Sequence, residues 1–374
     1  MVSKTNPAPI WVLMGKWHGD NLQLLAIAEA LQLPFQAIPL RFNHASKIPA
    51  PIRASSHIGW RTDQPLGPPW PRIVLAAGGK SVPTARWIRR QSGGHTKLVH
   101  VNRPWAPLSW FDLVITTPQY ALPARPNVLS NLMPFLPPPT EPPPEQWLPS
   151  AATSMPRPWT AVLIGGVTRP YVYSDAAART LAATVNRQVR EVGGSAWLLD
   201  SPRTPPNTMP ILERSVEVPS HTVHWRGEGK KAYRALLASA DRFIVTEDSA
   251  SMTTEALLSD RPVALFDLPT RPDWSRRFAS AWRTAAERAP SSTTARMFEA
   301  AVDIGLLTAV RDVRLLHRAL ARAGMFDGTG RPRELAEHER QVTLARIIQL
   351  MGSTDQDSLN SDIPAVQYEP SRRR

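Results

Sequence analysis

Residues 241–269, DRFIVTEDSASMTTEALLSDRPVALFDLP, have the pattern of a strand, a helix and a second strand. Two short apolar runs, at 243–245 and 263–266, are typical of buried strands. Between them a helix begins among small hydroxyl residues near Asp248 and ends before Pro262. The first turn of a helix leaves backbone N–H groups unpaired, so small residues there favour a phosphate site. This strand–helix–strand unit is the predicted centre of the function.

Glu255 lies about one and a half turns into this helix, within reach of the ribose of a nucleotide at the helix start. The same local pattern also describes a plain N-cap, in which Asp248 or Ser249 bonds the first free N–H groups without any ligand. A plain cap is the more common case in α/β proteins. The local residues therefore leave both interpretations open.

The chain begins with a similar unit, because residues 10–40 have the pattern strand, glycine loop, helix, strand, with the helix expected at 21–31. In a right-handed βαβ unit the loop lies at the carboxyl ends of the strands, where ligands bind. Histidine is the residue type most often used as a general base, so His18 is a candidate, and Asp20 would orient it or replace it. The alternative is that Asp20 only caps the helix.

Three further strands are predicted at 73–77, 97–101 and 112–116. The first ends in Gly-Lys-Ser at 79–81, which suggests a P-loop, but that motif needs glycine at position 74, which is valine. The sequence therefore excludes a Walker A site here. His100, inside a predicted strand, is more typical of a core histidine than of a catalyst.

A proline-dense segment at 134–158 divides the chain and cannot form a helix or a central strand. Alternating strands and helices on both sides of it predict an α/β fold of two Rossmann-like, doubly wound domains that face each other across a cleft. The expected boundaries are 1–133 for the first domain, 134–158 for the linker, 159–350 for the second domain with its terminal helices, and 351–374 for a disordered tail.

Composition limits the environment and the partners. The chain has 374 residues, no cysteine and a formal net charge of +13, and residues 1–150 hold 14 Lys/Arg against 6 Asp/Glu. Without cysteine there are no disulfides, thiolate metal sites or cysteine nucleophiles. No nucleic-acid motif accompanies the basic residues, so we expect no nucleic-acid partner and favour an acidic substrate or an anionic membrane surface. An arginine-rich proteome explains the charge equally well. We expect a cytoplasmic protein, either free or peripheral at the inner face of the membrane.

The run Asp-Ser-x-Ser-Met-x-x-Glu-Ala at 248–256, followed by Pro-Val at 262–263, resembles the donor-binding segment of the GT-B glycosyltransferases. Together with residues 15–23, 76–90 and 102–118, it resembles still more the mitochondrial fission, or "elongated mitochondria" (ELM), family. The resemblance extends over about residues 10–350 and departs in residues 41–70, the linker and the tail.

This resemblance implies a metal-independent glycosyltransferase that uses a nucleotide-diphosphate sugar and no further cofactor. The second domain would hold the donor, and the implied nucleotide contacts are Gly165, Gly166, Arg203, Asp248, Ser249, Ser251, Met252 and Glu255. The first domain would receive the acceptor, an anionic or membrane-associated glycan or lipid, with His18 and Asp20 as catalytic candidates. The expected acceptor-side residues are Gly15, Asn21, Gln23, Gly78, Gly79, Lys80 and Arg103.

The sequence leaves two alternative functions open. The first is a nucleotide-sugar epimerase or hydrolase built on the same two-domain frame. The second is a non-catalytic adaptor, since the family's name refers to membrane fission rather than to a reaction. Nucleotide binding without turnover of any sugar donor would favour the adaptor.

Overall fold

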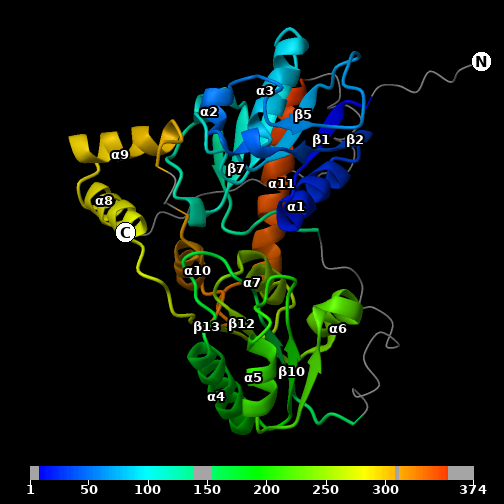
Figure 1. Ribbon diagram of the computed structural model, residues 1–374, viewed down its shortest axis with the longest axis vertical. Helices are drawn as coiled ribbons and strands as arrows, with labels where there is room; N and C mark the ends of the chain where they lie inside the picture. Colours follow the sequence, from blue (N-terminus) through cyan, green and yellow to red (C-terminus); the bar gives the residue numbers. More distant parts are fainter. Residues whose placement is uncertain (1–7, 138–153, 308–310, 353–374) are drawn as a thin grey trace, which may run out of the picture.

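The structure, a computed structural model, describes residues 8–137, 154–307 and 311–352 (Figure 1). Its first sheet has six strands in the order β2-β1-β5-β6-β7-β8, and every neighbouring pair is parallel. The strands are β1 (Ile10–Met14), β2 (Phe35–Pro39), β5 (Ile73–Ala77), β6 (Lys97–Val101), β7 (Leu113–Thr116) and β8 (Val128–Ser130).

Helices cover both faces of this sheet, because its central strands are apolar on both sides. Ile10 and Val12 pack in one cluster with residues of α1 (His18–Ala30). Trp11 and Leu13 pack in another with residues of α3 (Val82–Gln91). Alternate side chains of one strand therefore contribute to opposite layers of the core.

Residues 41–70 form a small insertion over the second of these faces. It contains β3 (Arg41–Phe42), which pairs antiparallel with β4 (Trp60–Arg61), and the short helix α2 (Ala50–Arg53). Trp60 is 6% exposed within the α3-side cluster, and the ring centroid of Trp70 lies 5.8 Å from that of Trp11. Both tryptophans thus pack onto the sheet.

The second sheet has five parallel strands in the order β11-β10-β9-β12-β13. These are β9 (Trp159–Leu163), β10 (Ser195–Leu199), β11 (Ser220–Val223), β12 (Arg242–Thr246) and β13 (Val263–Phe266). Residues of α4 (Asp175–Val192) and α5 (Thr208–Ser215) share a cluster on one face. Residues of α6 (Lys230–Ser239) and α7 (Ala250–Leu257) share a cluster on the other. The expected α/β class with two doubly wound parallel sheets is confirmed.

Four helices follow the second sheet. Helices α8 (Trp274–Arg288) and α9 (Thr293–Asp303) pack on each other and project from one side of the molecule (Figure 1). Helix α10 (Val313–Arg322) packs in the α6–α7 cluster of the second domain. Helix α11 (Pro332–Met351) then returns to the first domain, where Ile347 and Met351 are buried with residues of α1 and β1. One helix is therefore shared by both domains.

Some predicted bounds differ from the structure. The helix expected at 21–31 starts at His18. The sequence also predicts a short strand at His224 and Trp225, but the structure has this strand at 220–223. Strand β8 was not predicted. Most of the predicted linker, residues 138–153, and of the predicted tail, residues 353–374, lies outside the described residues.

Candidate active site

The strand order of each sheet defines where a ligand is expected. In the first sheet the order reverses between β1 and β5, and in the second between β9 and β12. In doubly wound sheets, ligands bind outside the carboxyl ends of the strands at this switch point. The loops after β1, β5, β9 and β12 are therefore the geometric candidates, and they contain most of the residues that the sequence indicated.

The two switch points lie against each other. Gly19 is in the first turn of α1 and Ser251 in the first turn of α7. A Cβ atom added to Gly19 would lie 3.9 Å from Ser251 Oγ, so the two helix starts approach to contact distance across the domain boundary. Both starts carry the positive end of a helix dipole. The four loops therefore form one site with an anion-attracting centre.

Asn21 shapes the loop after β1. Its Oδ1 accepts a hydrogen bond from the Gly15 N–H at 2.8 Å, and its Nδ2 donates to the Gly15 carbonyl at 3.0 Å. Gln23 is buried and donates from Nε2 to the Gly19 carbonyl at 3.4 Å. These two predicted acceptor-side residues hold the loop in shape with their side chains.

Asp20 is the carboxylate at this switch point. Its Oδ1 accepts a hydrogen bond of 3.0 Å from Asn102 Nδ2, and a Cβ added to Gly78 would lie 3.7 Å from its Oδ2. Burial raises the pKa of Asp20 above 3.8, and this shift exceeds the opposing effects of the Arg311 charge and the Asn102 bond. A raised pKa makes a carboxylate a stronger base, which suits proton abstraction near neutral pH.

His18 is exposed at the first position of α1, and its side chain has no hydrogen-bond partner among the described residues. Residues two apart on a helix point in different directions. The structure thus gives His18 and Asp20 separate surroundings, and no bond between them is present in the described part of the chain. Of the two catalytic candidates, Asp20 is the one held in a fixed position.

The glycine loop after β5 contributes one residue to the surroundings of Asp20. Gly78 has φ +72°, in the left-handed region, and it borders the Asp20 carboxylate. Gly79 packs elsewhere, because a Cβ there would lie 3.1 Å from the Pro104 carbonyl oxygen. Lys80 is exposed, with its Nζ 5.6 Å from the ring centroid of Phe42.

Arg103, predicted on the acceptor side, is buried at the base of α9. Its side chain is only 1% exposed, and its Nη2 donates to the carbonyl oxygens of Leu307 at 2.7 Å and Val302 at 3.4 Å. Burial lowers its pKa to about 10. The guanidinium therefore ties the end of α9 to the first domain and is not presented to the loop that contains Asp20.

Asp248 stabilises the loop after β9 with hydrogen bonds. It is 1% exposed and accepts hydrogen bonds from the Gly166 N–H at 2.8 Å, Tyr173 Oη at 2.6 Å and Thr246 Oγ1 at 2.7 Å. Burial raises its pKa. A Cβ added to Gly165 would lie 2.3 Å from an oxygen of this carboxylate, so only glycine fits there. The side chain is surrounded by protein groups and shapes the paired glycines.

The second glycine of that pair packs against the loop after β10. A Cβ added to Gly166 would lie 2.3 Å from the backbone of Arg203. The exposed Arg203 side chain donates from Nη1 to Thr168 Oγ1 at 2.8 Å. Its guanidinium therefore lies next to the glycine loop, where it can turn to an anion.

The start of α7 has the geometry of a helix cap. The Ser249 side chain accepts from the Met252 N–H at 3.4 Å and is 8% exposed. Ser251 is half-buried and faces Gly19. Ser249 thus caps the helix, as the plain N-cap interpretation predicts, while Ser251 faces the other domain.

Glu255 is hydrogen-bonded by a residue of α6. Its carboxylate accepts a hydrogen bond from the Tyr233 hydroxyl, and burial raises its pKa. Trp225 lies next to this pair, with its ring centroid 6.3 Å from that of Tyr233. Tyr233 was not predicted as a site residue, because 22 positions separate it from Glu255 in the chain.

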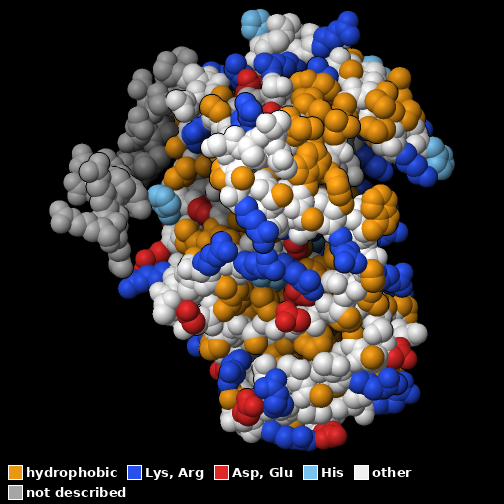
Figure 2. All heavy atoms as spheres, turned by 90° about the vertical axis from the view of Figure 1, so that its left-hand side faces the viewer, with side chains coloured by type: hydrophobic (Ala, Val, Ile, Leu, Met, Phe, Trp, Pro, Cys, Tyr) orange, Lys and Arg blue, Asp and Glu red, His pale blue; other side chains and the backbone are white. Residues whose placement is uncertain are grey.

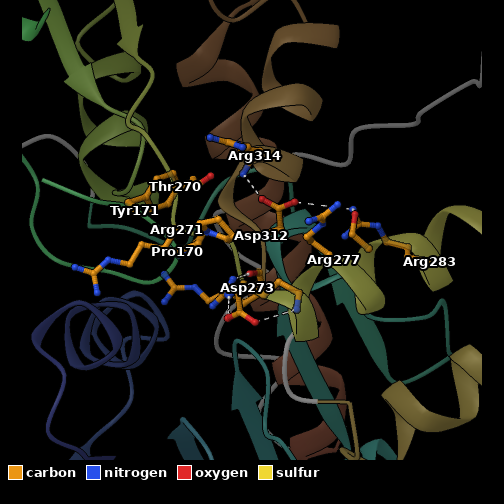
Figure 3. Close-up of a pocket in the computed structure, with 13 residues that line it drawn as sticks. Pro170, Tyr171, Thr270, Arg271, Asp273, Arg277, Arg283, Asp312 and Arg314 are labelled. Atoms are coloured by element: carbon orange, nitrogen blue, oxygen red, sulfur yellow. Dashed lines mark hydrogen bonds and ion pairs between the residues drawn. The ribbon is translucent and has the colours of Figure 1, made fainter. Parts of the chain in front are cut away.

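A hollow of about 370 Å³ beside these loops was also not predicted (Figure 3). Its walls come from residues 170–171, 270–283 and 311–314, and it is lined by the arginines 271, 276, 277, 283, 311 and 314. The sequence showed an arginine-rich region here but not that these side chains surround one space.

Two further properties concern metals and membranes. Within the described residues, no group of three His, Cys, Asp or Glu side chains is arranged to hold a metal ion. None of the helices in the described ranges is both long and apolar enough to cross a bilayer.

Residues 18–301 match the family model described as Mitochondrial fission ELM1. The chain belongs to this family. A curated relative, the mitochondrial fission protein ELM1 of Arabidopsis thaliana, is 25% identical over 243 residues. That alignment covers 59% of this chain and 56% of the relative, so the chain spans little more than half the relative's length.

Solved structures of other proteins are more distantly similar. Arabidopsis thaliana UGT89C1, complexed with UDP-L-rhamnose, has a TM-score of 0.45 and 11% identity, and the match covers 93% of this chain and 100% of that one. MnaA of S. aureus, in a structure with UDP, has a TM-score of 0.43 and 11% identity, over 83% and 94% of the two chains. The fold assigned to this chain rests on its own sheet topology.

Proposed function

We propose that this protein is a glycosyltransferase that transfers a sugar from a nucleotide diphosphate to an acceptor hydroxyl in the interdomain site. The observation that carries the proposal is the contact between the two switch points, with Gly19 and Ser251 facing each other. This geometry would bring a donor on the second domain against an acceptor on the first. The resemblance to nucleotide-sugar enzymes in residues 241–269 supports the same choice.

The donor diphosphate would lie at the start of α7, next to the paired glycines after β9. Unpaired backbone N–H groups and the helix dipole stabilise negative charge at such a position. Arg203 adds a guanidinium beside the glycines, and guanidinium groups bind phosphate oxygens in pairs. These groups would stabilise the leaving diphosphate without a metal ion. The ribose would lie near Glu255.

Asp20 would act as the general base. As its carboxylate takes the proton of the acceptor hydroxyl, the hydroxyl oxygen bonds to the anomeric carbon, and the bond from that carbon to the diphosphate breaks. The negative charge leaves with the nucleotide diphosphate. Asn102 fixes one oxygen of Asp20, which leaves the other for the acceptor proton.

Calorimetry with uridine diphosphate, followed by turnover assays with a panel of nucleotide sugars, tests the proposal. Replacing Ser249 and Ser251 by alanine should weaken nucleotide binding, at about 0.5–1.5 kcal/mol for each lost hydrogen bond. The control replaces Thr180 and Thr184, on the exposed side of α4, and should bind as the wild type does. Equal affinity in the serine double variant would exclude this donor position. Nucleotide binding without consumption of any donor would favour the adaptor alternative.

A further inference from the structure

The hollow beside α8 has an excess of positive charge that the protein does not neutralise. Six arginines line it, against Asp273 and Asp312 (Figure 3). Three of the arginines have acidic partners: Arg314 donates to buried Glu247 at 3.0 Å, Arg276 lies 3.6 Å from Asp273, and Arg283 lies 3.5 Å from Glu287. Those three are anchored in the wall.

The other three arginines form no ion pair in the described part of the chain, although the charge of Arg311 acts on Asp20. The guanidinium of Arg311 only donates from Nε to Gln119 Oε1, at 3.4 Å, and those of Arg271 and Arg277 have no hydrogen-bond or ion-pair partner there. Like charges that share a hollow repel each other, so an arrangement of this kind favours an anionic ligand. Guanidinium groups from separate elements suit the several oxygens of a phosphate.

The position of the hollow separates it from the proposed donor site. None of Gly165, Gly166, Ser249 and Ser251 lines it. Arg311 connects it to the first domain instead, because its charge acts on Asp20 and the neighbouring Asp312 N–H donates to the Gln119 carbonyl at 2.8 Å. The hollow therefore contacts the first domain near Gln119 and lies within electrostatic range of the proposed base.

Two exposed aromatic side chains also lie on α8, but they do not line the hollow. Trp274 is 81% exposed and Phe278 is 57% exposed. Figure 2 faces the side from which α8 projects, and it shows Lys and Arg side chains gathered across the middle of the molecule with hydrophobic ones above and below. The basic band includes the arginines of the hollow and suits an anionic ligand.

We infer that this hollow binds a phosphate group carried by the acceptor, so the acceptor class is a phosphate-bearing alcohol. The inference rests on the proposed function for the meaning of "acceptor", but the phosphate site is testable without any transfer reaction. The phosphate is held by Arg271, Arg277 and Arg311, and it places the acceptor hydroxyl towards Asp20.

Two probes separate the sources of phosphate: glycerol phosphate in solution, and phosphatidylcholine vesicles that contain phosphatidic acid. Replacing Arg271 and Arg277 by alanine should weaken binding of at least one probe about tenfold or more, and leave uridine diphosphate affinity unchanged. The matched control replaces Arg179 and Arg187 on α4, which removes the same charge far from the hollow, and should bind both probes normally.

The inference is overturned if neither probe binds the wild-type protein, or if the variant and its control lose binding equally. It is also overturned if the Arg271 and Arg277 variant loses uridine diphosphate instead, since the hollow would then hold the donor. Failure of the proposed function would give a different result. A protein that turns over no sugar donor can still bind phosphate through these two arginines.

Discussion

Single residues in this protein owe their properties mainly to burial. Asp20, Asp248 and Glu255 all have pKa values raised by desolvation, but only Asp20 borders the contact between the domains. The other two carboxylates are occupied by tyrosine hydroxyls. The same chemical group thus serves as a candidate base at one position and as a structural acceptor at two others.

Asp20→Asn tests the proposed base. The variant should fold and bind nucleotide as the wild type does, and its turnover should fall by about 100-fold or more, because the amide cannot accept the proton. His18→Ala should keep most of the rate, since His18 has no fixed position. Near-normal turnover in Asp20→Asn, measured on a validated donor and acceptor, would show that the loop is structural.

The pH dependence of turnover gives a second check on Asp20. Turnover should fall as the pH drops through the raised pKa of this carboxyl, because the protonated form is not a base. The Arg311 charge lowers that pKa, so Arg311→Met should move the acid limb of kcat/KM to higher pH. An acid limb that moves to lower pH, or does not move, would contradict this electrostatic link.

His100 makes stability depend on pH. It is fully buried in β6, with Nδ1 3.2 Å from the Asn102 carbonyl oxygen, and burial lowers its pKa from 6.5 to about 4. Between these values the unfolded chain binds the proton more tightly, so stability falls as the pH decreases from 6.5 towards 4. The loss at pH 5 should be about 1–2 kcal/mol. Urea unfolding of His100→Gln at pH 7 and pH 5 should show a smaller difference than the wild type shows.

At the scale of elements, the α8–α9 pair depends on one buried cation. Arg103 donates to two carbonyl oxygens at the end of α9, and Gly305, with φ +79°, lets the chain pass within contact of Ala106. The apolar contacts of α9 are otherwise to α8 and a few partly buried residues. The pair is therefore attached to the first domain mainly at its base.

Arg103→Ala should loosen this attachment. The lost hydrogen bonds to carbonyl oxygens should lower the free energy of unfolding by about 2 kcal/mol or more. Amide hydrogen exchange should rise in α8 and α9 and stay unchanged in β9–β12. The control Arg125→Ala removes partly exposed pairings with Glu299 and Asp303 of α9 and should have a smaller effect. Equal exchange in both variants would place the attachment elsewhere.

Most elements were predictable from the sequence, because apolar runs and helix caps act locally. The misplaced strand contains Ser220, His221 and Thr222 and has no apolar run, because it is an edge strand that is only partly buried and is held by its pairing with β10. Helix α1 begins early because Asn21 folds its loop back onto Gly15. The switch-point loops were correctly located as strand ends, but partners such as Tyr233, Tyr173 and the arginines of the hollow come from distant parts of the chain.

In the whole molecule, the two domains approach each other most visibly where the start of α1 contacts the start of α7. Gly19 is helical, and a Cβ there would meet Ser251 Oγ at 3.9 Å, an ordinary contact distance. Alanine at this position therefore fits the closed arrangement, whereas a larger side chain would hold the two helix starts apart. The domain contact can thus be tested at one residue.

Gly19→Phe should keep both domains folded and increase the radius of gyration in small-angle scattering, while Gly19→Ala should match the wild type. Turnover should fall in the phenylalanine variant, because donor and acceptor no longer meet. Nucleotide affinity should change little, since the donor contacts lie on the second domain. Scattering curves that coincide for both variants would show that this contact does not set the distance between the domains.

Helix α11 affects the order in which the two domains fold. Ile347 and Met351 fill part of the core beneath β1 and α1, and Asn131 donates to Thr343 Oγ1 at 2.9 Å. During synthesis the first sheet leaves the ribosome long before these residues exist, so its core stays incomplete until residue 351 has emerged. The domain that is made first therefore finishes folding last, and the second domain has to fold beside an unfinished partner.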